Sequence, residues 1–590
     1  MPQSRSEIQL AQDLFGRICR HPATPAILLF LTNLFLIAPA FFPSLADLGV
    51  WDQPAYLAAG QQLMDEGNYP VFAGNPLTSL FYGLMYLPFR SSPLWMVHSC
   101  TLGRFLLFTL LWLALYLIGK ELSNLIPPLL LPGILLVTPL AVEVMTFPSD
   151  PLFAGLAGLS FWQLLRFAKS RDHRAALYAS ALLGLSALAR NDGVVLFPIF
   201  LVLIALLNRG NAGWKRIALA SIVPYAALVG GYILIYGFVT GNFDPGTAAR
   251  TYDNFESGQF LIESSGNINN VIDVRLQARE IFGTPEENHS NVFLAISRNP
   301  AMYLERVRRL LRDLPRILLQ AYGKRFAPLL FLLALQGIWA LIKQRAFRQL
   351  ALFLLWPAHL LTGFIITIFR PGHLTFVYFI VYALAAIGLA SWMQYPIHWK
   401  NRGLWAAALL LLGLYGILDE KLAFFYAALV FLLVEILIST LQIRSKERAT
   451  LVSLLILAAA GIVLRQGFPS PIQRNLGESE PEQAVIFMTE NLPAGSIVAA
   501  GSPGYIQAAR LGTFVLAATD TPYDLNSADF IEWIKDQGVD YLFADYSLVA
   551  ENASLWALIE PGIGEQFELL FTSSGGDIRI YSLSGEEPCK

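Results

Sequence analysis

Charged residues and cysteines are scarce in this chain. Lys, Arg, Asp and Glu make up 14% of its 590 residues, whereas about a quarter of a soluble domain is charged. The three cysteines, Cys19, Cys100 and Cys589, are too far apart in sequence to indicate a disulfide framework or a zinc site. The net charge of -2 gives no basic excess that would neutralise phosphates, which argues against nucleic acid as a partner.

Apolar residues are abundant and occur in long runs. They make up 55% of the chain, and the mean hydropathy is +0.52. A helix needs about 17 to 25 apolar residues to cross a bilayer. We therefore predict an α-helical polytopic membrane protein with about thirteen spans in residues 1–465. The spans are expected at 25–42, 105–119, 125–142, 152–167, 175–189, 193–207, 217–238, 326–342, 350–369, 374–393, 404–418, 422–441 and 449–464.

Lysine and arginine residues gather in alternate short loops, which are cytoplasmic by the positive-inside rule. The N-terminus is then cytoplasmic, and the loops 43–104 and 240–325 and the tail after Arg465 are extracytoplasmic. We expect a multi-pass protein of the plasma (inner) membrane. The basic residues are Arg166, Lys169, Arg171, Arg174, Arg209, Lys215, Arg216, Lys343, Arg345, Arg348, Lys400, Arg402, Arg444, Lys446 and Arg448.

The tail, residues 466–590, is predicted to be a soluble extracytoplasmic α/β domain. Short β-rich runs alternate with helical patterns, in the rhythm of a βαβ fold. Gly575-Gly576 suits a turn between the last two strands. Its role is either structural or regulatory packing or contact with a substrate. The expected strands are 496–500, 513–517, 541–544, 567–572 and 578–582, and the expected helices are 505–511 and 528–537.

Two acidic residues lie just outside the apolar spans. Asp52 is in the loop after the first span, and Asp150 is in the loop between the third and fourth spans. An ionisable group is costly near hydrocarbon, so it points to a functional site. Both positions also suit a helix start, because Pro54 follows Asp52 and Asp150 lies in Ser149-Asp150-Pro151. Each residue is therefore either a catalytic carboxylate or a helix cap.

This arrangement resembles the C-type (GT-C) membrane glycosyltransferases, among them the aminoarabinose transferases and the protein O-mannosyltransferases. A short N-terminus and one span precede a large outer loop that opens with Asp-x-x-x-Tyr, here Asp52 to Tyr56. Asp150 stands where the family has a second acidic loop. Many relatives carry Asp-Glu in the first loop, where this chain has Asp52-Gln53. The matching segments are 52–56, 67–70, 75–89, 103–104 and 185–198.

The resemblance implies transfer of a sugar, with inversion, from a polyprenyl-phosphate donor to an acceptor hydroxyl on the extracytoplasmic face. A polyprenyl phosphate is a good leaving group, so the enzyme mainly needs a carboxylate that takes the acceptor proton and cations that hold the phosphate. Asp52 is the expected base. Asp150 is expected either to orient the acceptor or to partner a phosphate-binding arginine. The acceptor is a lipid, a glycan or a protein, and no cofactor is expected.

The resemblance also implies further site residues. Arginine suits phosphate because its planar fork donates paired hydrogen bonds and stays charged. Arg190 has an alternative role as the partner of Asp192, and Arg370 as a residue that extends to the membrane surface. His373 is not expected to bind a metal, because no second ligand lies at suitable spacing. The donor-phosphate candidates are Arg104, Arg190, Arg370, Lys324 and Arg325, and the substrate-orienting candidates are Tyr56, Tyr82 and His373.

Residues 302–325 predict an amphipathic helix in the outer membrane interface. It either rests against anionic lipid or gathers the lipid-linked donor. Its apolar stripe is Leu304, Val307, Leu310, Leu311 and Leu314, and its basic side is Arg306, Arg308, Arg309 and Arg312.

The alternative function is a transporter or flippase of a lipid-linked glycan, and a non-catalytic scaffold or sensor is a third possibility. Transporters commonly contain inverted repeats and helices broken at mid-membrane. This chain instead concentrates its polar residues in large outer loops and a soluble tail, which favours the enzyme.

Overall fold

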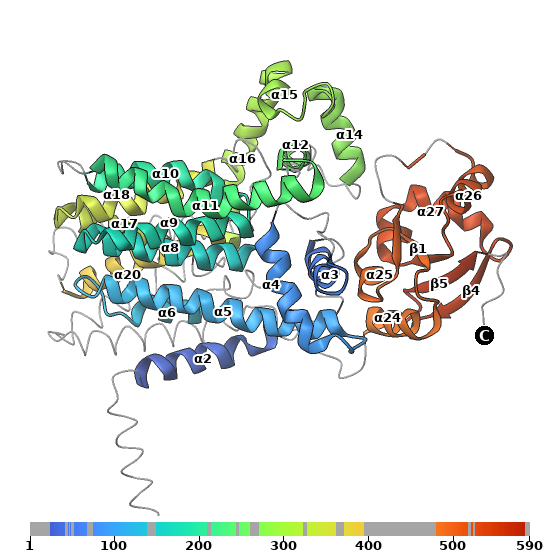
Figure 1. Cartoon of the computed structure of the whole chain (residues 1–590), viewed down its shortest axis with the longest axis horizontal. Coiled ribbons are helices and arrows are strands. Elements are labelled where there is room, and N and C mark those ends of the chain that lie inside the picture. The colour runs from blue at the N-terminus through green and yellow to red at the C-terminus, as the bar shows by residue number, and fades with distance from the viewer. Residues whose placement is uncertain are drawn as a thin grey trace, which may run out of the picture.

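The computed structural model contains a helical bundle, a pair of helices across one end of the bundle and an α/β domain beyond that pair (Figure 1). The residues that it describes are 24–41, 45, 48, 52–67, 75–137, 149–208, 214–243, 247–259, 271–321, 327–361, 371–394, 479–516, 521–522 and 525–583.

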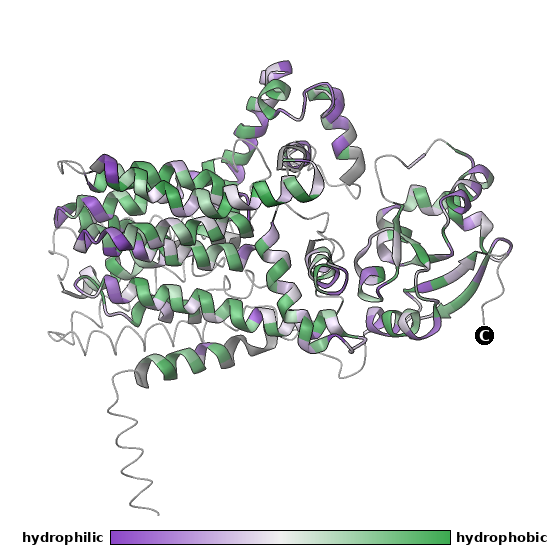
Figure 2. Ribbon diagram, in the orientation of Figure 1, coloured by the Kyte–Doolittle hydropathy of each residue, from purple (hydrophilic) through white to green (hydrophobic). Residues whose placement is uncertain are grey.

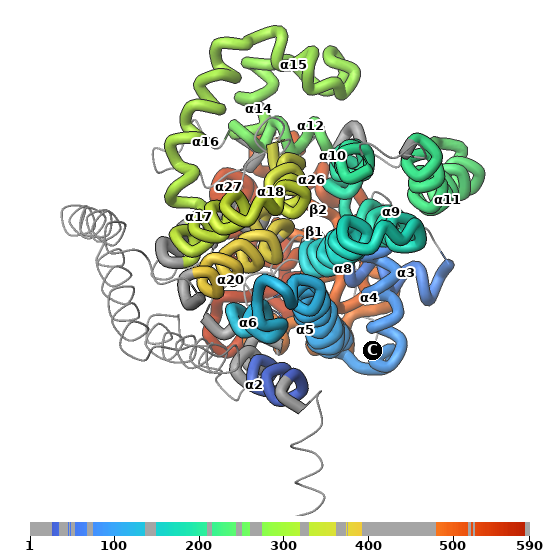
Figure 3. The backbone as a smooth tube through the Cα atoms, turned by 90° about the vertical axis from the view of Figure 1, so that its left-hand side faces the viewer, coloured from blue at the N-terminus to red at the C-terminus, as the bar shows by residue number. Residues whose placement is uncertain are grey.

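The helices of the bundle run side by side, as the view along their axes shows (Figure 3). Phe108, Phe153 and Trp356 belong to one continuous core of buried side chains. Two helices approach very closely at Gly337, where a Cβ would lie 2.0 Å from the carbonyl oxygen of Leu384, so only glycine fits. The helices are α2 (Thr24–Phe41), α5 (Trp95–Glu121), α6 (Leu130–Gly133), η3 (Ile134–Val137), α8 (Asp150–Ser170), α9 (His173–Ala189), α10 (Asp192–Leu207), α11 (Trp214–Thr240), α17 (Ala327–Lys343), α18 (Phe347–Leu355), η4 (Trp356–His359), η5 (Pro371–Val377) and α20 (Tyr378–Gln394).

Helix is present in each predicted span that the structure describes. Two helices within the described residues, Trp95–Glu121 and Lys215–Thr240, are long and apolar enough to cross a membrane. Asp192–Leu207, Leu330–Lys343 and Tyr378–Ser391 are shorter apolar helices. The predicted spans at 404–418, 422–441 and 449–464 lie outside the described residues, so the number of spans stays a prediction.

Two predicted spans are not continuous α-helices. In 125–142 the α-helix α6 covers only Leu130–Gly133 and passes into the 3-10 helix η3. In 350–369 the helix α18 stops at Leu355 and the 3-10 helix η4 follows. Prolines at 127, 128, 132 and 357 explain both changes, because proline lacks the N–H that an α-helix needs and clashes with the preceding turn.

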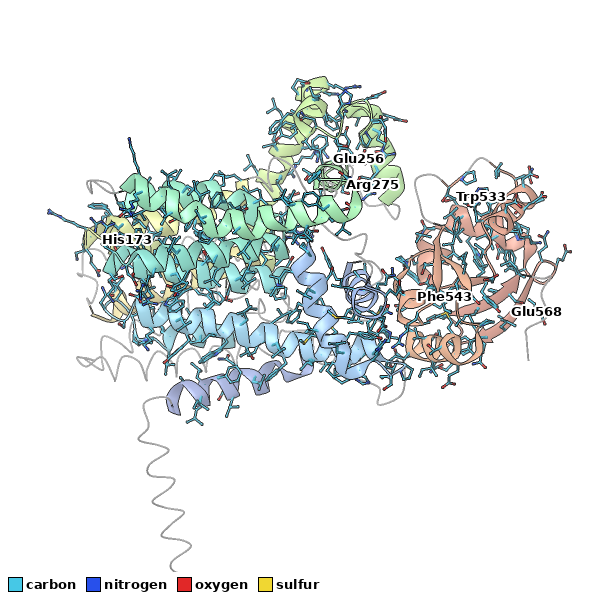
Figure 4. The ribbon with its side chains drawn as sticks, in the orientation of Figure 1. His173, Glu256, Arg275, Trp533, Phe543 and Glu568 are labelled. Carbon is cyan, nitrogen blue, oxygen red and sulfur yellow. The ribbon has the colours of Figure 1, made fainter. Side chains whose placement is uncertain are left out.

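Four helices of the predicted outer loop 240–325 pack around a small core of their own. Glu256 on one of them is 1% exposed, and Arg279 pairs with it at 2.8 Å. Figure 4 labels Glu256 and Arg275 in this part of the molecule. The helices are α12 (Thr247–Ser257), α14 (Val271–Phe282), α15 (Val292–Arg298) and α16 (Pro300–Ala321).

Helix α16 is amphipathic as predicted, with hydrophilic and hydrophobic residues alternating along it (Figure 2). Arg306, however, is buried, so its predicted place on the polar side is wrong. Its guanidinium lies 4.6 Å from the ring centre of Phe255 and 5.6 Å from that of Phe282, and it donates a hydrogen bond to the carbonyl of Phe255 at 2.8 Å. Burial lowers the pKa of Arg306 to about 10. The covering rings come from α12 and α14, which the pattern of α16 alone does not reveal.

The C-terminal domain contains the predicted sheet, whose strand order is β2-β1-β3-β5-β4. β1 is parallel to β2 and β3, and β5 is antiparallel to β3 and β4. Gly576 has φ +85 in the turn before β5, which confirms the turn expected at this glycine pair. The strands are β1 (Ile497–Ala500), β2 (Gly512–Val515), β3 (Tyr541–Ala544), β4 (Phe567–Thr572) and β5 (Arg579–Leu583), and the helices are α24 (Glu480–Asn491), α25 (Gly504–Ala508), α26 (Ser527–Asp536), η6 (Ser547–Glu551), α27 (Ala553–Ile559) and η7 (Glu560–Gly562).

Helices α3 (Asp52–Asp65) and α4 (Pro76–Tyr86), followed by the 3-10 helix η2 (Leu87–Phe89), lie between the bundle and the C-terminal domain (Figure 1). They touch each other at Gly60 and Gly83, where a Cβ on Gly60 would lie 2.4 Å from the amide nitrogen of Gly83. A single buried core includes Tyr56 and Tyr86 of these helices together with Met488, Ile506 and Phe543 of the C-terminal domain. Phe543 is labelled in Figure 4 on the sheet, and its ring centre lies 5.8 Å from that of Tyr505 on α25. The C-terminal domain is thus packed directly on the outer-loop helices.

Candidate active site

Arg190 lies at the C-terminal end of α9, where the chain turns sharply into α10. Its backbone is extended, with φ -160 and ψ 140, and α10 already begins at Asp192. Asp192 therefore sits in the first turn of α10, where the helix dipole favours negative charge. Asp150 is the first residue of α8 and is followed by Pro151, which suits the first turn of a helix. The helix starts predicted for Asp150 and for Asp52, the first residue of α3, are both present.

The Arg190 guanidinium bridges two carboxylates. Its Nη1 lies 2.6 Å from Oδ1 of Asp150, and its Nε lies 2.5 Å from Oδ2 of Asp192. Nη1 also donates to Oγ of Ser149 at 3.2 Å, and the guanidinium carbon lies 4.8 Å from the ring centre of Phe376. The pairing with Asp192 that sequence allowed is confirmed, and Asp150 is a second partner. We name Asp150, Arg190 and Asp192 the bridged carboxylate pair.

The bridged carboxylate pair has one closed side and one open side. The Asp150 side chain is 6% exposed, whereas those of Arg190 and Asp192 are 25% and 28% exposed. Asp150 is therefore held away from solvent, and a ligand can reach Arg190 and Asp192. A guanidinium between two carboxylates stabilises their charged forms and fixes their positions.

Helices α3 and α4 lie against this end of the bundle. Oγ1 of Thr78 on α4 donates to the carbonyl of Ala189 at 2.9 Å, next to Arg190. Tyr56 on α3 is 1% exposed, accepts a hydrogen bond at its hydroxyl from Nδ2 of Asn75, and interacts electrostatically with Arg190. Position 52 lies four residues before Tyr56 and so on the same face of α3. That helix face is the one directed at the bridged carboxylate pair.

Tyr82 and Arg104 form the part of the site between α4 and α5. They are 1% and 4% exposed, and Tyr82 interacts electrostatically with both Arg104 and Asp150. Burial raises the pKa of Tyr82 well above its usual value of 10.0. The Tyr82 ring packs against Gly103, where a Cβ would lie 3.0 Å from Cε1. Arg104 is thus a buried cation within the electrostatic reach of the site.

Two histidines lie on the other side of Asp192, with which both interact electrostatically. His373, in η5, has its ring centre 5.7 Å from that of Phe376, the ring that also lies under Arg190. His359, in η4, is 1% exposed, and its Nδ1 lies 2.8 Å from the carbonyl of Trp356. Sequence reasoning missed His359. The available signal was an ionisable residue inside a predicted span.

Six of the residues expected at the site from sequence therefore gather at one end of the bundle: Asp150, Arg190, Tyr56, Tyr82, Arg104 and His373. Asp52 begins α3 beside them. Arg370, Lys324 and Arg325 lie outside the described residues. In the part of the chain that the structure describes, no group of three or more His, Cys, Asp or Glu side chains could hold a metal ion.

No protein-family model matches the sequence, and no curated protein matches it. The structure is similar to solved membrane enzymes. ArnT from Cupriavidus metallidurans bound to undecaprenyl phosphate has 14% sequence identity and a TM-score of 0.54, over 96% of this chain and 100% of that one. ArnT in the apo state has 13% identity and the same TM-score and coverage. The Archaeoglobus fulgidus oligosaccharyltransferase in complex with Zn and sulfate has 12% identity and a TM-score of 0.50, over 94% of this chain and 73% of that one.

These similarities establish the fold. The chain has the fold of the C-type membrane glycosyltransferases, so the resemblance expected from sequence is confirmed at that level. Among solved structures of this fold, it is similar to ArnT, an aminoarabinose transferase, over nearly its whole length.

Proposed function

We propose that this protein is a multi-pass membrane glycosyltransferase that moves a sugar from a polyprenyl-phosphate donor to an acceptor hydroxyl. The observation that carries the proposal is the bridged carboxylate pair beside the N-terminal half of α3, in a chain with the fold of ArnT. That ArnT structure contains undecaprenyl phosphate. Carboxylates and buried arginines at one end of an apolar bundle suit a lipid-linked donor with a charged phosphate and an apolar tail.

Asp52 is the proposed general base. Inversion requires the acceptor oxygen to attack the anomeric carbon as the phosphate leaves from the opposite side. The acceptor proton passes to a carboxylate, which is general-base catalysis. Asp150 is less suited to this role because it is 6% exposed and paired with Arg190. Asp150 instead fixes Arg190, as expected of a carboxylate that partners a phosphate-binding arginine.

Arg190 and Arg104 are the proposed phosphate-binding residues among those described, with Arg370, Lys324 and Arg325 as further candidates outside them. Arg190 keeps a quarter of its side chain exposed although it has two carboxylate partners. Arg104 is 4% exposed on α5 and acts on Tyr82 electrostatically. Positive charge fixed before the reaction stabilises the negative charge that develops on the leaving phosphate. Tyr56, Tyr82 and His373 are proposed to orient the substrates around these groups.

The proposed location is the plasma (inner) membrane, with the N-terminus cytoplasmic and the site and the C-terminal domain extracytoplasmic. The basic loops of the sequence support this orientation. The site lies at the end of the bundle next to α3, α4 and the C-terminal domain. The proposed acceptor is a lipid, a glycan or a protein of the cell envelope.

The test is a mass-spectrometric analysis of the lipids that co-purify with the protein, followed by incubation of the protein in liposomes with polyprenyl-phosphate sugars and envelope extracts. We expect a co-purified polyprenyl phosphate and, after incubation, release of free polyprenyl phosphate together with a glycosylated product. Movement of the intact donor between leaflets without release of the phosphate carrier would instead identify a flippase. Neither lipid binding nor release would refute both functions.

The matched variants are Arg104→Ala and Arg174→Ala. Arg174 is an exposed arginine on α9, at the opposite end of that helix from Arg190. Arg104→Ala is expected to reduce the co-purified lipid, and Arg174→Ala is expected to leave it unchanged. Equal lipid content in the two variants would remove Arg104 from the donor site.

A further inference from the structure

The C-terminal end of α3 is joined to the C-terminal domain through Arg510. Nη2 of Arg510 donates to the carbonyl of Arg90 at 2.6 Å. The guanidinium carbon lies 5.6 Å from the ring centre of Tyr86 and 5.8 Å from that of Trp95. These rings meet edge to face at 5.0 Å, and Nε1 of Trp95 donates to the carbonyl of Ala508 at 3.0 Å. The contact thus works in both directions between the domains.

Asp65, the last residue of α3, is the charged centre of this contact. It accepts hydrogen bonds from Tyr86 at 2.6 Å and from Gln61 at 2.8 Å, and it pairs with Arg90 at 2.8 Å. Burial opposes its charged form, but the two hydrogen bonds and the positive charges of Arg90 and Arg510 lower the pKa of Asp65. Arg510 is therefore coupled to α3 through both the Tyr86 ring and the Asp65 charge. We name Asp65, Tyr86, Trp95 and Arg510 the α3 anchor.

The backbone of Arg510 is unfavourable for an arginine. Its φ of 60 lies in the left-handed region, just after the end of α25, where glycine is the usual residue. A non-glycine residue in this conformation costs about 1–2 kcal/mol. Glycine would thus suit the domain's own fold better, and the arginine side chain serves the contact with Tyr86 and Trp95. An outlier of this kind is a reason to look for function.

Helix α3 depends on this contact for its placement. Within the described residues it packs mainly on α4 and on α25 of the C-terminal domain. Its other end carries Asp52 and Tyr56, and Tyr56 acts electrostatically on Arg190 of the bridged carboxylate pair. A helix transmits a shift at one end to the other, because its backbone hydrogen bonds make it a rigid element. The 14 residues of α3 therefore link the α3 anchor to the candidate active site.

We propose that the C-terminal domain positions α3 for catalysis through the α3 anchor, with Arg510 as its positioning residue. This inference rests on the proposed transferase function. It assigns the domain a role in turnover rather than in binding the donor, because the proposed phosphate-binding Arg104 lies on α5. That helix is held by its own packing in the bundle core through Leu107, Leu111 and Leu115.

The experiment compares Arg510→Gly with Arg345→Gly in the full-length protein. Both residues have a left-handed backbone, with φ 60 and φ 54, so glycine relieves the same local strain in both. Arg345 is exposed between α17 and α18, in the bundle. Trp95→Phe is a second variant, because it removes the hydrogen bond to Ala508 and keeps an aromatic ring. Amide hydrogen exchange along α3 is measured without substrate, and kcat and donor Kd are measured in liposomes.

For Arg510→Gly we expect exchange along α3 to rise roughly tenfold, because the anchoring contacts are lost. We expect kcat to fall on the order of tenfold, since a small misplacement of a reacting group costs about that much or more. The donor Kd should stay within about twofold of the wild-type value, within measurement error of an unchanged contact. Trp95→Phe should change exchange and kcat in the same direction by less, and Arg345→Gly should change neither.

The outcomes separate this inference from the proposed function. Unchanged exchange in Arg510→Gly overturns the anchor. Raised exchange with an unchanged kcat overturns its positioning role. A donor Kd that rises in parallel with the loss of kcat also overturns it, because the domain would then act on donor binding. Raised exchange in a protein whose wild type transfers no sugar refutes the transferase function and leaves the structural anchor standing.

Discussion

Replacing Arg190 by lysine tests whether the geometry of the bridged carboxylate pair matters beyond its charge. The two carboxylates bind different nitrogens, Nη1 for Asp150 and Nε for Asp192. A lysine ammonium is a single point charge and cannot reproduce this planar fork. Arg190→Lys should therefore keep the positive charge and lose one of the two ion pairs.

The size of the effect follows from the burial of each partner. Asp150 is 6% exposed, and a lost hydrogen bond to a charged group at such a site costs about 1.5–3 kcal/mol. Asp192 is 28% exposed, and a pair so close to solvent contributes at most about 1 kcal/mol. The stacking on Phe376 adds about 0.5–1 kcal/mol. We expect a total loss of about 2–4 kcal/mol, which leaves a typical protein folded.

The assay is thermal unfolding in nanodiscs together with sugar transfer in liposomes. Arg190→Lys should lower the melting temperature by several degrees and reduce transfer by roughly tenfold or more, at 1.4 kcal/mol for each tenfold change. Arg174→Lys on the exposed end of α9 is the matched control and should behave as wild type. Adding Asp150→Asn to Arg190→Lys should cost less than the sum of the two single changes, because both remove the same ion pair. A lysine variant as stable and as active as wild type would refute the geometric argument.

Four further predictions concern the base, the donor, the topology and pH. Asp52→Asn should reduce transfer on the order of a hundredfold with little change in donor binding, whereas a helix cap would tolerate asparagine; normal transfer would exclude Asp52 as the base. Arg104→Ala should weaken polyprenyl-phosphate affinity roughly ten- to a hundredfold, as measured by lipid binding; an unchanged Kd contradicts the assignment. Reporter fusions after Gln466 and after Lys343 should lie on opposite sides of the membrane, and the same side for both would disprove the predicted topology. Because the pKa of Asp65 is lowered from 3.8, its stabilising effect is present above 3.8 and is lost as the pH falls below it; hydrogen exchange along α3 should then rise, and Asp65→Asn should remove that pH dependence.

The C-terminal sheet could be predicted almost residue by residue. Its strands are short and local, and β-rich runs bounded by turn residues mark each of them, so β4 lies at Phe567–Thr572 as expected. Likewise, Ser149-Asp150-Pro151 and the Arg190–Asp192 spacing are local signals, and both correspond to features of the structure. Local pattern therefore identified the positions of the acidic residues and one of the two ion pairs.

The remaining features depend on contacts between distant parts of the chain. Asp150 and Arg190 are 40 residues apart, and only the packing of α8 against α9 brings them together. Arg306 is covered by Phe255, which is 51 residues away. A helical pattern shows which face of a helix is apolar but does not show what covers it. Sequence consequently gave the residue types of the site without their pairing.

The core shared by the outer-loop helices and the C-terminal domain has a consequence for the synthesis of the protein. Trp95 and Ala508, which are joined by a hydrogen bond across that core, are 413 residues apart. During translation, α3 and α4 thus wait with an uncovered apolar face until nearly the whole chain has been made. A nonsense mutation near the 3′ end of the gene should then yield no partly active enzyme. It should yield a polypeptide with an exposed apolar face, the kind of surface that chaperones and proteases recognise.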